Sequence, residues 1–485
     1  MVPSLGEPLD MGRKWGARSP IAGSIALIAL LSSVALVLTG LPAASKGNSG
    51  CAPARHPGGD WPIYGHDLSN TRSQEKEKKI GLVEAATLQP AWHISSEELD
   101  GSGDFSGTPV VADGCLYVGS NDGWVFAVNA DSGKLVWSAN VKKGGINSSL
   151  AVDGGRVYAT VSDVGKPYLV AFDQDNGDEL WRTEIDNQPG SDVYSSPVVF
   201  GGMVFTGWSG GSAELGDEAD RYPFQGGFVL VDARTGKLLE KTYTIRPPDK
   251  NPDKPKDLYA GGAIWSTPAV DLDQGYAYVG GGNPFRPQEE HKHTNAILKI
   301  DIDRSRSTFG AIVDHYKGTP DEYIPAFSDI PCYDIPGNPA PYYPQGIGQC
   351  GDLDMDFGAS PNLWKEGGKT LVGEGQKSGI YHTVDASNMK RVWTAIVGPP
   401  SAVGGIVGST ALANDHIYGP ITVPDYLWAL DAPAGTPTWF APVGDGAHWG
   451  NPVSEANGVV YTVDVKGFLN GYDSTTGAQV LAFPL

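Results

Sequence analysis

Four cysteines, Cys51, Cys115, Cys332 and Cys350, have spacings that limit the chemistry of the chain. They form no Cys-x-x-Cys, no vicinal pair and no Cys-x-x-Cys-His, so the sequence carries no thiol redox, zinc or covalent haem motif. Four cysteines allow three disulfide pairings. We expect Cys332 to pair with Cys350, because the two bracket a Pro-, Gly- and Tyr-rich stretch without a strand pattern. Cys51 with Cys115 is then the default second pair.

Carboxylates and imidazoles gather in a segment that breaks the regular pattern of the chain, between Asn283 and Thr294. Glu289 and Glu290 stand there beside His291 and His293. Such side chains accept and donate protons when a site holds them, and they are merely solvated on a flexible loop. The elements around the segment decide between these two interpretations.

Composition indicates which elements these are. Gly (65) and Pro (37) make up roughly a fifth of the 485 residues, while 10% are aromatic and 19% charged. This mixture favours many short strands joined by tight turns, hence an all-β body. A hydrophobic content of 40% is ample for a packed core. The formal net charge of −21, from 35 basic and 56 acidic residues, repels a phosphate backbone and argues against nucleic-acid binding.

Two sequence units alternate along the chain. The first is an apolar strand followed by Asp-x-x-x-Gly-x-x-x-Trp or a close variant. The second is Ser/Thr-Pro-x-Val, a glycine turn and another apolar strand. Each period of about 45 residues therefore holds about four short strands, which is typical of one propeller blade. The clearest copies of the first unit span 127–137 and 171–181, and those of the second span 108–119, 196–207, 267–280 and 451–462.

The outer strand of each expected blade carries a large apolar residue after the glycine. We expect the glycine to supply a positive φ in a hairpin turn and the large side chain to pack against the neighbouring blade. Counting these strands predicts eight blades, with the strand around Trp92 pairing with the last blade to close the ring. Seven blades is the alternative, because the copy near Ile312 is degenerate. The counted strands lie at Trp92, Trp137, Trp181, Leu239, Ile312, Trp393, Trp439 and Leu481.

Three segments interrupt the period, at 246–260, 283–294 and 319–353. In a ring of regular blades, long insertions collect on one face and often build the functional site. The first insertion, rich in Pro, Asp and Lys, is equally consistent with a solvated loop that has no role.

The N-terminus indicates the compartment. Arg13, Lys14 and Arg18 precede an uncharged apolar run over 21–41, which small residues follow. This is the layout of a secretory signal, and a run of about 20 residues is also long enough to span a bilayer. We expect residues 1–44 to be a cleaved signal or a retained anchor and 45–485 to be the propeller. In both cases the protein is exported, to the periplasm, the cell envelope or the exterior, where disulfides persist.

The repeats, together with several more specific stretches, resemble the propeller of the quinoprotein alcohol dehydrogenases, which bind pyrroloquinoline quinone. The likeness is greatest to the polyvinyl alcohol dehydrogenase-like proteins and covers nearly all of the chain after the apolar run. The repeat alone is weak support, because non-catalytic assembly proteins carry it too. The specific stretches run from Trp61 to Arg72, Tyr222 to Ile245, Gly261 to Asp271, Asp352 to Pro361 and Gly375 to Gly379.

The resemblance implies a cofactor site with four residues in named roles. Trp265 matches the family's floor tryptophan, whose indole offers a flat platform for a planar quinone. Lys377 matches the basic residue that donates hydrogen bonds to the quinone oxygens. Glu214 and Asn283 match calcium ligands, and a hard cation with oxygen ligands makes the quinone carbonyl electrophilic. The alternative for each is structural: a core tryptophan, an exposed hairpin lysine or a turn residue.

The catalytic base is where this sequence departs from the family. The resemblance implies a carboxylate, which takes the alcohol proton, directly before the strand that here begins at Ala296. This chain has Asn295 at that place, and an amide cannot accept a proton at neutral pH. Glu289 and Glu290 are the nearest substitutes.

We therefore expect an exported quinoprotein that oxidises a secondary alcohol or polyol, resembling polyvinyl alcohol, by hydride transfer to pyrroloquinoline quinone polarised by Ca²⁺. With no attached haem domain expected, it needs a separate electron acceptor such as a cytochrome c or a quinone. The alternative is a non-catalytic propeller, a scaffold or binding protein of the cell envelope. Two departures favour the alternative: Phe224-Gln225 replaces a vicinal cysteine pair, and the glycine-rich stretch 404–408 lacks a tryptophan.

Overall fold

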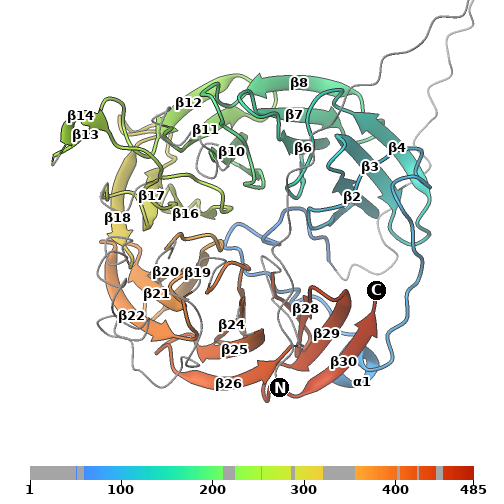
Figure 1. The fold of residues 1–485 in the computed structure, drawn as a ribbon. Coiled ribbons are helices and arrows are strands. Elements are labelled where there is room, and N and C mark those ends of the chain that lie inside the picture. The colour runs from blue at the N-terminus through green and yellow to red at the C-terminus, as the bar shows by residue number, and fades with distance from the viewer. Residues whose placement is uncertain are drawn as a thin grey trace, which may run out of the picture. The chain divides into compact units, whose positions relative to one another are not determined.

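The computed structural model describes residues 51, 59–210, 224–252, 254–285, 290–319, 355–400, 405–422, 425–443 and 452–485. Their strands form seven four-stranded antiparallel sheets, which follow one another around a ring (Figure 1). The predicted all-β propeller with four-stranded blades is therefore confirmed. Of the two predicted blade numbers, the described residues give seven and not eight.

Four blades form the first half of the ring, and each runs in chain order between its inner and outer strand. Blade 1 contains β1 (Val110–Ala112), β2 (Cys115–Gly119), β3 (Trp124–Asn129) and β4 (Leu135–Asn140). Blade 2 contains β5 (Ala151–Asp153), β6 (Arg156–Val161), β7 (Tyr168–Asp173) and β8 (Glu179–Glu184). Blade 3 contains β9 (Val198–Phe200), β10 (Met203–Trp208), β11 (Gly227–Asp232) and β12 (Leu238–Tyr243). Blade 4 contains β15 (Ala269–Asp271), β16 (Tyr276–Gly280), β17 (Ala296–Asp301) and β18 (Ile312–Lys317).

Three further blades complete the described ring. Blade 5 contains β19 (Asn362–Glu366), β20 (Lys369–Gly375), β21 (Ile380–Asp385) and β22 (Lys390–Ile396). Blade 6 contains β23 (Ala411–Ala413), β24 (His416–Ile421), β25 (Tyr426–Asp431) and β26 (Pro437–Pro442). Blade 7 contains β27 (Ser454–Ala456), β28 (Val459–Val463), β29 (Phe468–Asp473) and β30 (Gln479–Pro484). The first insertion forms a separate hairpin of β13 (Lys250–Asn251) and β14 (Lys254–Leu258), which projects outward beside blade 4 (Figure 1).

Where the outer strand of a blade carries the repeated tryptophan, its indole packs on the turn of the next blade, as the sequence predicts. Trp137 Nε1 donates a hydrogen bond to the Gln174 carbonyl at 2.9 Å, and Trp181 Nε1 reaches the Ala233 carbonyl at 3.2 Å. A Cβ added to Gly177 would lie 2.5 Å from Trp137 Cε3, so the indole packs directly on the glycine of the next turn. These glycines also have positive φ, which makes any side chain unfavourable there. The set is Gly133 (69°), Gly177 (76°), Gly236 (72°), Gly435 (70°) and Gly477 (72°).

Trp92 explains why the predicted eighth blade is absent from the described residues. Its Nε1 donates to the Ala130 carbonyl at 3.0 Å and its ring covers Gly133, so the docking contact forms as it does for Trp137 and Trp181. The chain then turns at 96–101, where Asp100 has a φ of 60°, and no strand forms between Trp92 and β1. Strand pairing requires a run of extended residues, whereas docking requires only one indole and one glycine. The degenerate copy near Ile312, by contrast, forms the regular outer strand β18.

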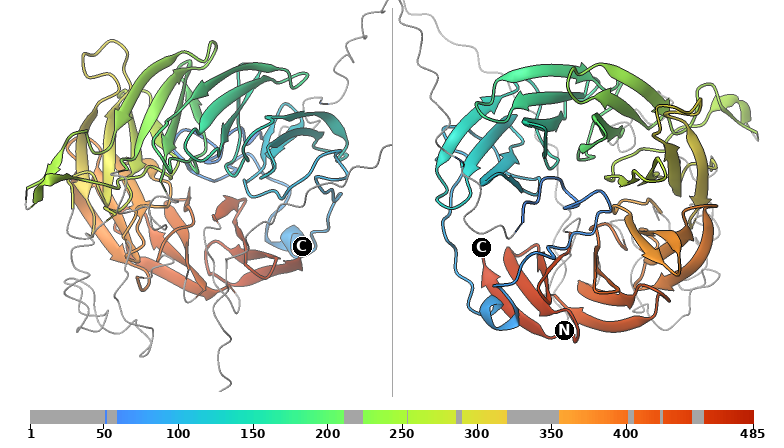
Figure 2. Two further views of the ribbon diagram at one scale, coloured as in Figure 1. Left: turned by 45° about the horizontal axis from the view of Figure 1, so that its top comes forward. Right: turned by 180° about the vertical axis from the view of Figure 1, so that it is seen from behind.

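The segment 61–72 ties the inner strands together in place of the predicted closure through Trp92. It crosses the middle of the ring, as the blue trace shows in Figure 1 and in the right-hand view of Figure 2. Backbone hydrogen bonds join it to six of the seven blades. The pairs are Trp61 with Val111, Pro62 with Val152, Leu68 with Val270, Ser69 with Leu363, Thr71 with Leu412 and Arg72 with Glu455. The short helix α1 (Leu82–Ala85) follows and packs beside β30.

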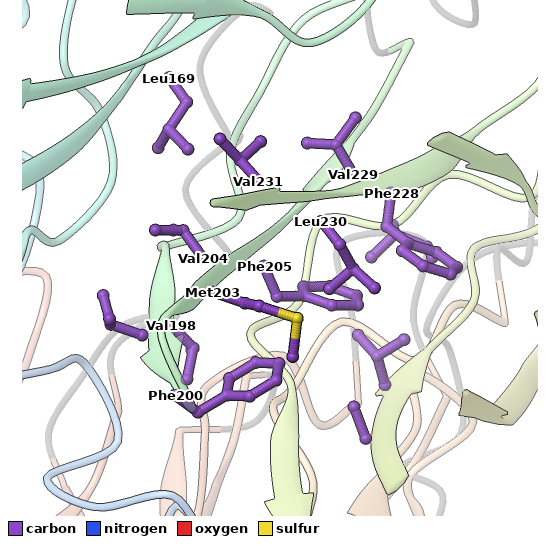
Figure 3. Packing of buried hydrophobic residues seen from close by; sticks show 14 of the residues in the cluster. Leu169, Val198, Phe200, Met203, Val204, Phe205, Phe228, Val229, Leu230 and Val231 are labelled. Atoms are coloured by element: carbon purple, nitrogen blue, oxygen red, sulfur yellow. The ribbon is translucent and has the colours of Figure 1, made fainter. Parts of the chain in front are cut away.

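Apolar side chains between the faces of neighbouring blades make up the core. The largest cluster joins blades 2, 3 and 4, with Phe205 and Phe228 stacked at a ring separation of 4.9 Å (Figure 3). Burying each such ring contributes about 1.5–3 kcal/mol. Trp208 belongs to this cluster and is 0% exposed, so it is a packing residue.

Cys51 and Cys115 form a disulfide, which confirms that predicted pair. The predicted Cys332–Cys350 pair lies outside the described residues, as does the predicted signal or anchor over 1–44. Within the part of the chain that the structure describes, no helix has the length and apolar character needed to cross a membrane.

Candidate functional site

Two adjacent blades place the predicted site residues at the ends of their inner strands. Trp265 precedes β15 and Asn283 follows β16 in blade 4. Asp356 precedes β19 and Lys377 follows β20 in blade 5. Because β15 and β19 lie side by side, residues about 100 positions apart in the chain meet at this blade junction.

The Asp356 carboxylate is the point at which these side chains meet. Its Oδ2 accepts hydrogen bonds from Trp265 Nε1 at 3.1 Å and from Lys377 Nζ at 3.3 Å. Its Oδ1 accepts one from the backbone N–H of Asn283. Asp356 is 5% exposed and Lys377 is 8% exposed. An ion pair so far from water is held more strongly than a surface pair, and each charge depends on the other.

Trp265 stands between this polar cluster and the centre of the ring. Lys377 Nζ lies 5.3 Å from the centroid of its indole, within cation–π range. A Cβ added to Gly358 would lie 2.2 Å from Trp265 Cη2, so only glycine allows the blade 5 backbone to approach the ring. The partly exposed indole also lines a cavity of about 560 Å³ at the middle of the ring, here called the central chamber.

Gln376 fixes the backbone on which Asp356 and Lys377 stand. Its buried amide donates hydrogen bonds to the carbonyls of Met355 at 2.7 Å and Thr319 at 2.9 Å, and it accepts one from His382 Nε2 at 2.9 Å. Burial lowers the pKa of His382 to about 3, so this imidazole is neutral and donates through Nε2. The backbone N–H of Lys377 also binds the Asp356 carbonyl at 3.0 Å. The carboxylate and the ammonium are therefore held in place before any ligand binds.

Glu290 and Asn295 lie together on the hairpin between β16 and β17. Asn295 Nδ2 donates to Glu290 Oε1 at 3.0 Å, and Thr294 Oγ1 donates to Glu290 Oε2 at 2.8 Å. Lys317 Nζ also contacts Glu290 Oε2. Each carboxylate thus has a lysine partner: Lys317 of β18 binds Glu290, and Lys377 binds Asp356, which also accepts a hydrogen bond from the Trp265 indole.

The histidines of this hairpin are neutral. Burial lowers the pKa values of His291 and His293 to about 4, and His293 Nδ1 binds the Thr244 carbonyl at 2.7 Å. Glu214 and Glu289, predicted respectively as a calcium ligand and a base, lie outside the described residues.

The described residues contain no group of three or more His, Cys, Asp and Glu side chains arranged to hold a metal ion. At the junction of blades 4 and 5, Asn283 and Asp356 are neighbours, and both side chains carry oxygen atoms that can bind a cation. A hard cation at this junction would need oxygen ligands from further groups. Glu214 is the further ligand that the family resemblance implies.

Asp356 is the residue of this cluster to which the sequence assigned no role. The stretch from Asp352 to Pro361 was recognised as specific, and Asp356 stands in it shortly before an inner strand, as Trp265 does before β15. That shared position is the signal that could have paired the two. The contact itself depends on the adjacency of blades 4 and 5, which no local pattern shows.

Comparison with known sequences gives relatives of two kinds. The family described as outer membrane protein assembly factor BamB matches residues 76–298. Polyvinylalcohol dehydrogenases of a Pseudomonas species and of Sphingopyxis sp. (strain 113P3) are 26% and 28% identical to this chain over 455 and 454 residues. The dehydrogenase subunit of the Gluconobacter oxydans (strain 621H) quinone alcohol dehydrogenase is 27% identical over 437 residues.

These relatives are longer than this chain. The alignments with the two polyvinylalcohol dehydrogenases cover 87% and 86% of this chain but 67% and 66% of those proteins. For the Gluconobacter oxydans subunit the shares are 81% and 50%. The chain thus spans between half and two thirds of the length of these curated relatives.

Solved structures share the fold. The quinohemoprotein alcohol dehydrogenase from Comamonas testosteroni superposes with a TM-score of 0.68 at 20% identity, over 88% of this chain and 73% of that chain. BamB from Moraxella catarrhalis gives a TM-score of 0.52 at 14% identity, over 79% and 88%. At these identities the likeness concerns the architecture alone.

Proposed function

We propose that this chain, which is similar in sequence to polyvinylalcohol dehydrogenases and shares its fold with a quinohemoprotein alcohol dehydrogenase, is an oxidoreductase that oxidises a secondary alcohol or polyol. Its cofactor in this proposal is pyrroloquinoline quinone with Ca²⁺. One observation carries the proposal: at the junction of blades 4 and 5, the Asp356 carboxylate accepts hydrogen bonds from the Trp265 indole and the Lys377 ammonium group.

The side chains present fit a planar, anionic quinone. Trp265 supplies an aromatic face that is not wholly covered by protein, and Lys377 supplies a buried cation beside it. Stacking on the indole and hydrogen bonds from the ammonium would hold such a ring in one orientation. When bound, the quinone supplies the electron acceptor for the oxidation.

Asp356 is the proposed general base, in place of Glu289, Glu290 or Asn295. Oxidation of an alcohol requires a group that takes the hydroxyl proton, and a carboxylate does this where an amide cannot. The Trp265 N–H and the Lys377 ammonium both bind Asp356 Oδ2, so they keep the carboxylate oriented. Water is largely excluded there, because Asp356 is only 5% exposed.

The proposed Ca²⁺ ligands are Asn283 and Glu214. Calcium prefers several oxygen ligands, and the Asp356 carboxylate next to Asn283 adds negative charge for a cation at this place. The cation would act as a Lewis acid toward the cofactor.

Export and a separate electron acceptor complete the proposal. The Cys51–Cys115 disulfide supports an oxidising compartment such as the periplasm, the envelope or the exterior, reached through residues 1–44 as a cleaved signal or an anchor. Electrons would leave to a cytochrome c or a quinone.

The match to an assembly factor favours the rival function, a non-catalytic envelope scaffold. That match ends at residue 298, before Asp356 and Lys377. The rival therefore accounts for the repeats of blades 1 to 3 and part of blade 4, but not for the buried ion pair in blade 5.

Paired variants test the assignment of the base. After loading with pyrroloquinoline quinone and Ca²⁺, we expect the wild type to reduce an artificial dye with secondary alcohols. Asp356→Asn should lower kcat by about 10²- to 10⁴-fold while the quinone still binds. Glu290→Gln is the matched control and should stay within about twofold. Loss of turnover in Glu290→Gln alone would move the base to Glu290, and no turnover in any protein would favour the scaffold.

A further inference from the structure

Asp425 is a buried carboxylate in the turn between β24 and β25 of blade 6. It is 8% exposed, and neither of its carboxyl oxygens has a hydrogen-bond partner. The hydroxyl oxygen of Thr422, at the start of the same turn, is also buried and also has no partner. Buried polar groups are nearly always paired, because an unpaired one costs free energy. Three buried oxygen atoms of one turn therefore lack the partners that such atoms require.

Asp464 brings a second carboxylate to this place, from the turn between β28 and β29 of the neighbouring blade 7 (Figure 1). Tyr472 on β29 donates a hydrogen bond to the Pro442 carbonyl at 3.0 Å, so blade 7 contacts the end of β26. The next backbone N–H, of Val443, donates to the Asp425 carbonyl at 3.4 Å. Burial, together with the negative charge of Asp464, raises the pKa of Asp425 to about 6. The two carboxylates are therefore close enough to repel each other.

The Asp464 carboxylate, unlike that of Asp425, is held in place by its own turn. Its Oδ1 accepts hydrogen bonds from the backbone N–H groups of Lys466 at 2.9 Å and Phe468 at 3.0 Å. Its Oδ2 accepts one from Asn470 Nδ2 at 3.0 Å. These donors orient the carboxylate and stabilise its charged form. Each carboxylate oxygen has two lone pairs, so this group can also bind a cation.

We propose that the junction of blades 6 and 7 binds a Ca²⁺ ion, with Asp425 and Asp464 as carboxylate ligands and the Thr422 hydroxyl as a neutral ligand. The two charges of the ion balance the two carboxylates and pair the buried oxygens of Asp425. The described residues here do not include a third acidic or imidazole ligand, so the remaining ligands are neutral oxygens, water among them. None of the three side chains lines the central chamber, and the inference stands without the proposed function.

The ligand set also indicates the affinity and the role of the ion. Ca²⁺ accepts about six to eight oxygen ligands in flexible geometry, and sites with few charged ligands bind it weakly. We therefore expect a Kd of about 10⁻⁴–10⁻³ M, as in extracellular calcium modules. The bound ion joins the turn that follows β24 to the turn that follows β28, so it stabilises the contact between the two blades.

Calcium titration of the purified, metal-stripped full chain tests this site. At pH 8, where Asp425 is ionised, we expect calorimetry to detect binding, and Ca²⁺ at ten times Kd to raise Tm by about 1–3 °C. Asp425→Asn should weaken binding at least tenfold and should not lower the Tm measured in chelator. The matched control is Asp122→Asn, which changes an exposed aspartate in the equivalent turn between β2 and β3 and should bind Ca²⁺ as the wild type does.

Two further variants keep the result unambiguous. If Asp425→Asn does not fold, Thr422→Val against Thr422→Ser tests the neutral ligand, and only the valine variant should weaken binding. Asn283→Ala separates this site from the calcium site proposed for the cofactor, and it should leave the binding that depends on Asp425 unchanged.

Three results would overturn the inference: no Ca²⁺ binding by the wild type, full binding by Asp425→Asn, or loss of all binding in Asn283→Ala. A Tm of Asp425→Asn that is lower by the same amount with and without Ca²⁺ would also overturn it, because Asp425 would then have only a packing role. Ca²⁺ binding that needs Asp425, in a protein that binds no quinone, would support this inference and contradict the proposed function alone.

Discussion

Glu374 on β20 is a buried carboxyl group that lowers the stability of the folded protein as the pH rises. It is 0% exposed, and neither carboxyl oxygen has a hydrogen-bond partner. A Cβ added to Gly280 of the neighbouring blade would lie 2.2 Å from its Oε1, so no space is left for water on that side. Burial raises the pKa of Glu374 well above its ordinary value of 4.5. The folded protein therefore keeps a proton that the unfolded chain releases.

The sign and size of the effect follow from proton linkage. Above pH 4.5 the unfolded chain gains the free energy of ionising Glu374 and the folded protein does not. The free energy of unfolding then falls by about 1.4 kcal/mol for each pH unit until the folded-state pKa is reached. Glu374→Gln has the same shape and no proton to lose. Its stability relative to the wild type should therefore rise by the same amount per pH unit.

Urea denaturation of both proteins between about pH 5 and pH 8 measures this difference. Glu179→Gln is the control, because hydrogen bonds from Arg182 lower the pKa of Glu179 below its ordinary value of 4.5. That carboxylate is ionised in both the folded and the unfolded state over this range, so the stability difference between this variant and the wild type should not change with pH. Parallel stability curves for the wild type and Glu374→Gln would refute the reasoning, since they would mean that Glu374 ionises freely in the folded state.

Three further predictions concern the ring itself. Gly236→Ala should cost about 1–3 kcal/mol in thermal unfolding, because its φ is 72° and a Cβ would lie 2.6 Å from an indole carbon. Gly201→Ala, at a φ of 53° with open space around it, should cost less. Reducing the Cys51–Cys115 disulfide, which closes 64 residues, should lower the free energy of unfolding by up to about 4 kcal/mol, as denaturation with and without reductant measures. His293, whose pKa is about 4 when folded and 6.5 when unfolded, contributes stability that is lost as the pH falls below 6.5, so His293→Gln should flatten this loss in acid denaturation.

The repeats predicted the blades well because each depends on local features. A glycine with positive φ, a large apolar residue after it and an apolar strand all occur within one period, and blades 1 to 7 follow from them. The error at Trp92 has the same origin. The sequence pattern of an indole that packs on Gly133 is the same whether or not the indole lies on a strand. The pattern therefore could not distinguish an indole that only packs on the blade from a strand that pairs with it.

The site was only half predictable, because its contacts cross from one blade to the next. The stretches around Trp265 and Lys377 resemble the quinoprotein family and indicated these two residues, and the structure brings both onto Asp356. The role of Asp356 depends on which strands become neighbours. Arg72 shows the same limit, since its partners Val453 and Ser454 come from blade 7, at the other end of the chain.

The measurement that tests the central claim most directly is titration of the purified protein with pyrroloquinoline quinone in the presence of Ca²⁺, followed by absorbance and by alcohol-dependent dye reduction. We expect saturable binding that Trp265→Ala and Lys377→Met each weaken by about 10- to 100-fold, with turnover only where the quinone is bound. A wild-type protein that binds no quinone, or that binds it equally well without Trp265 and Lys377, would contradict the account.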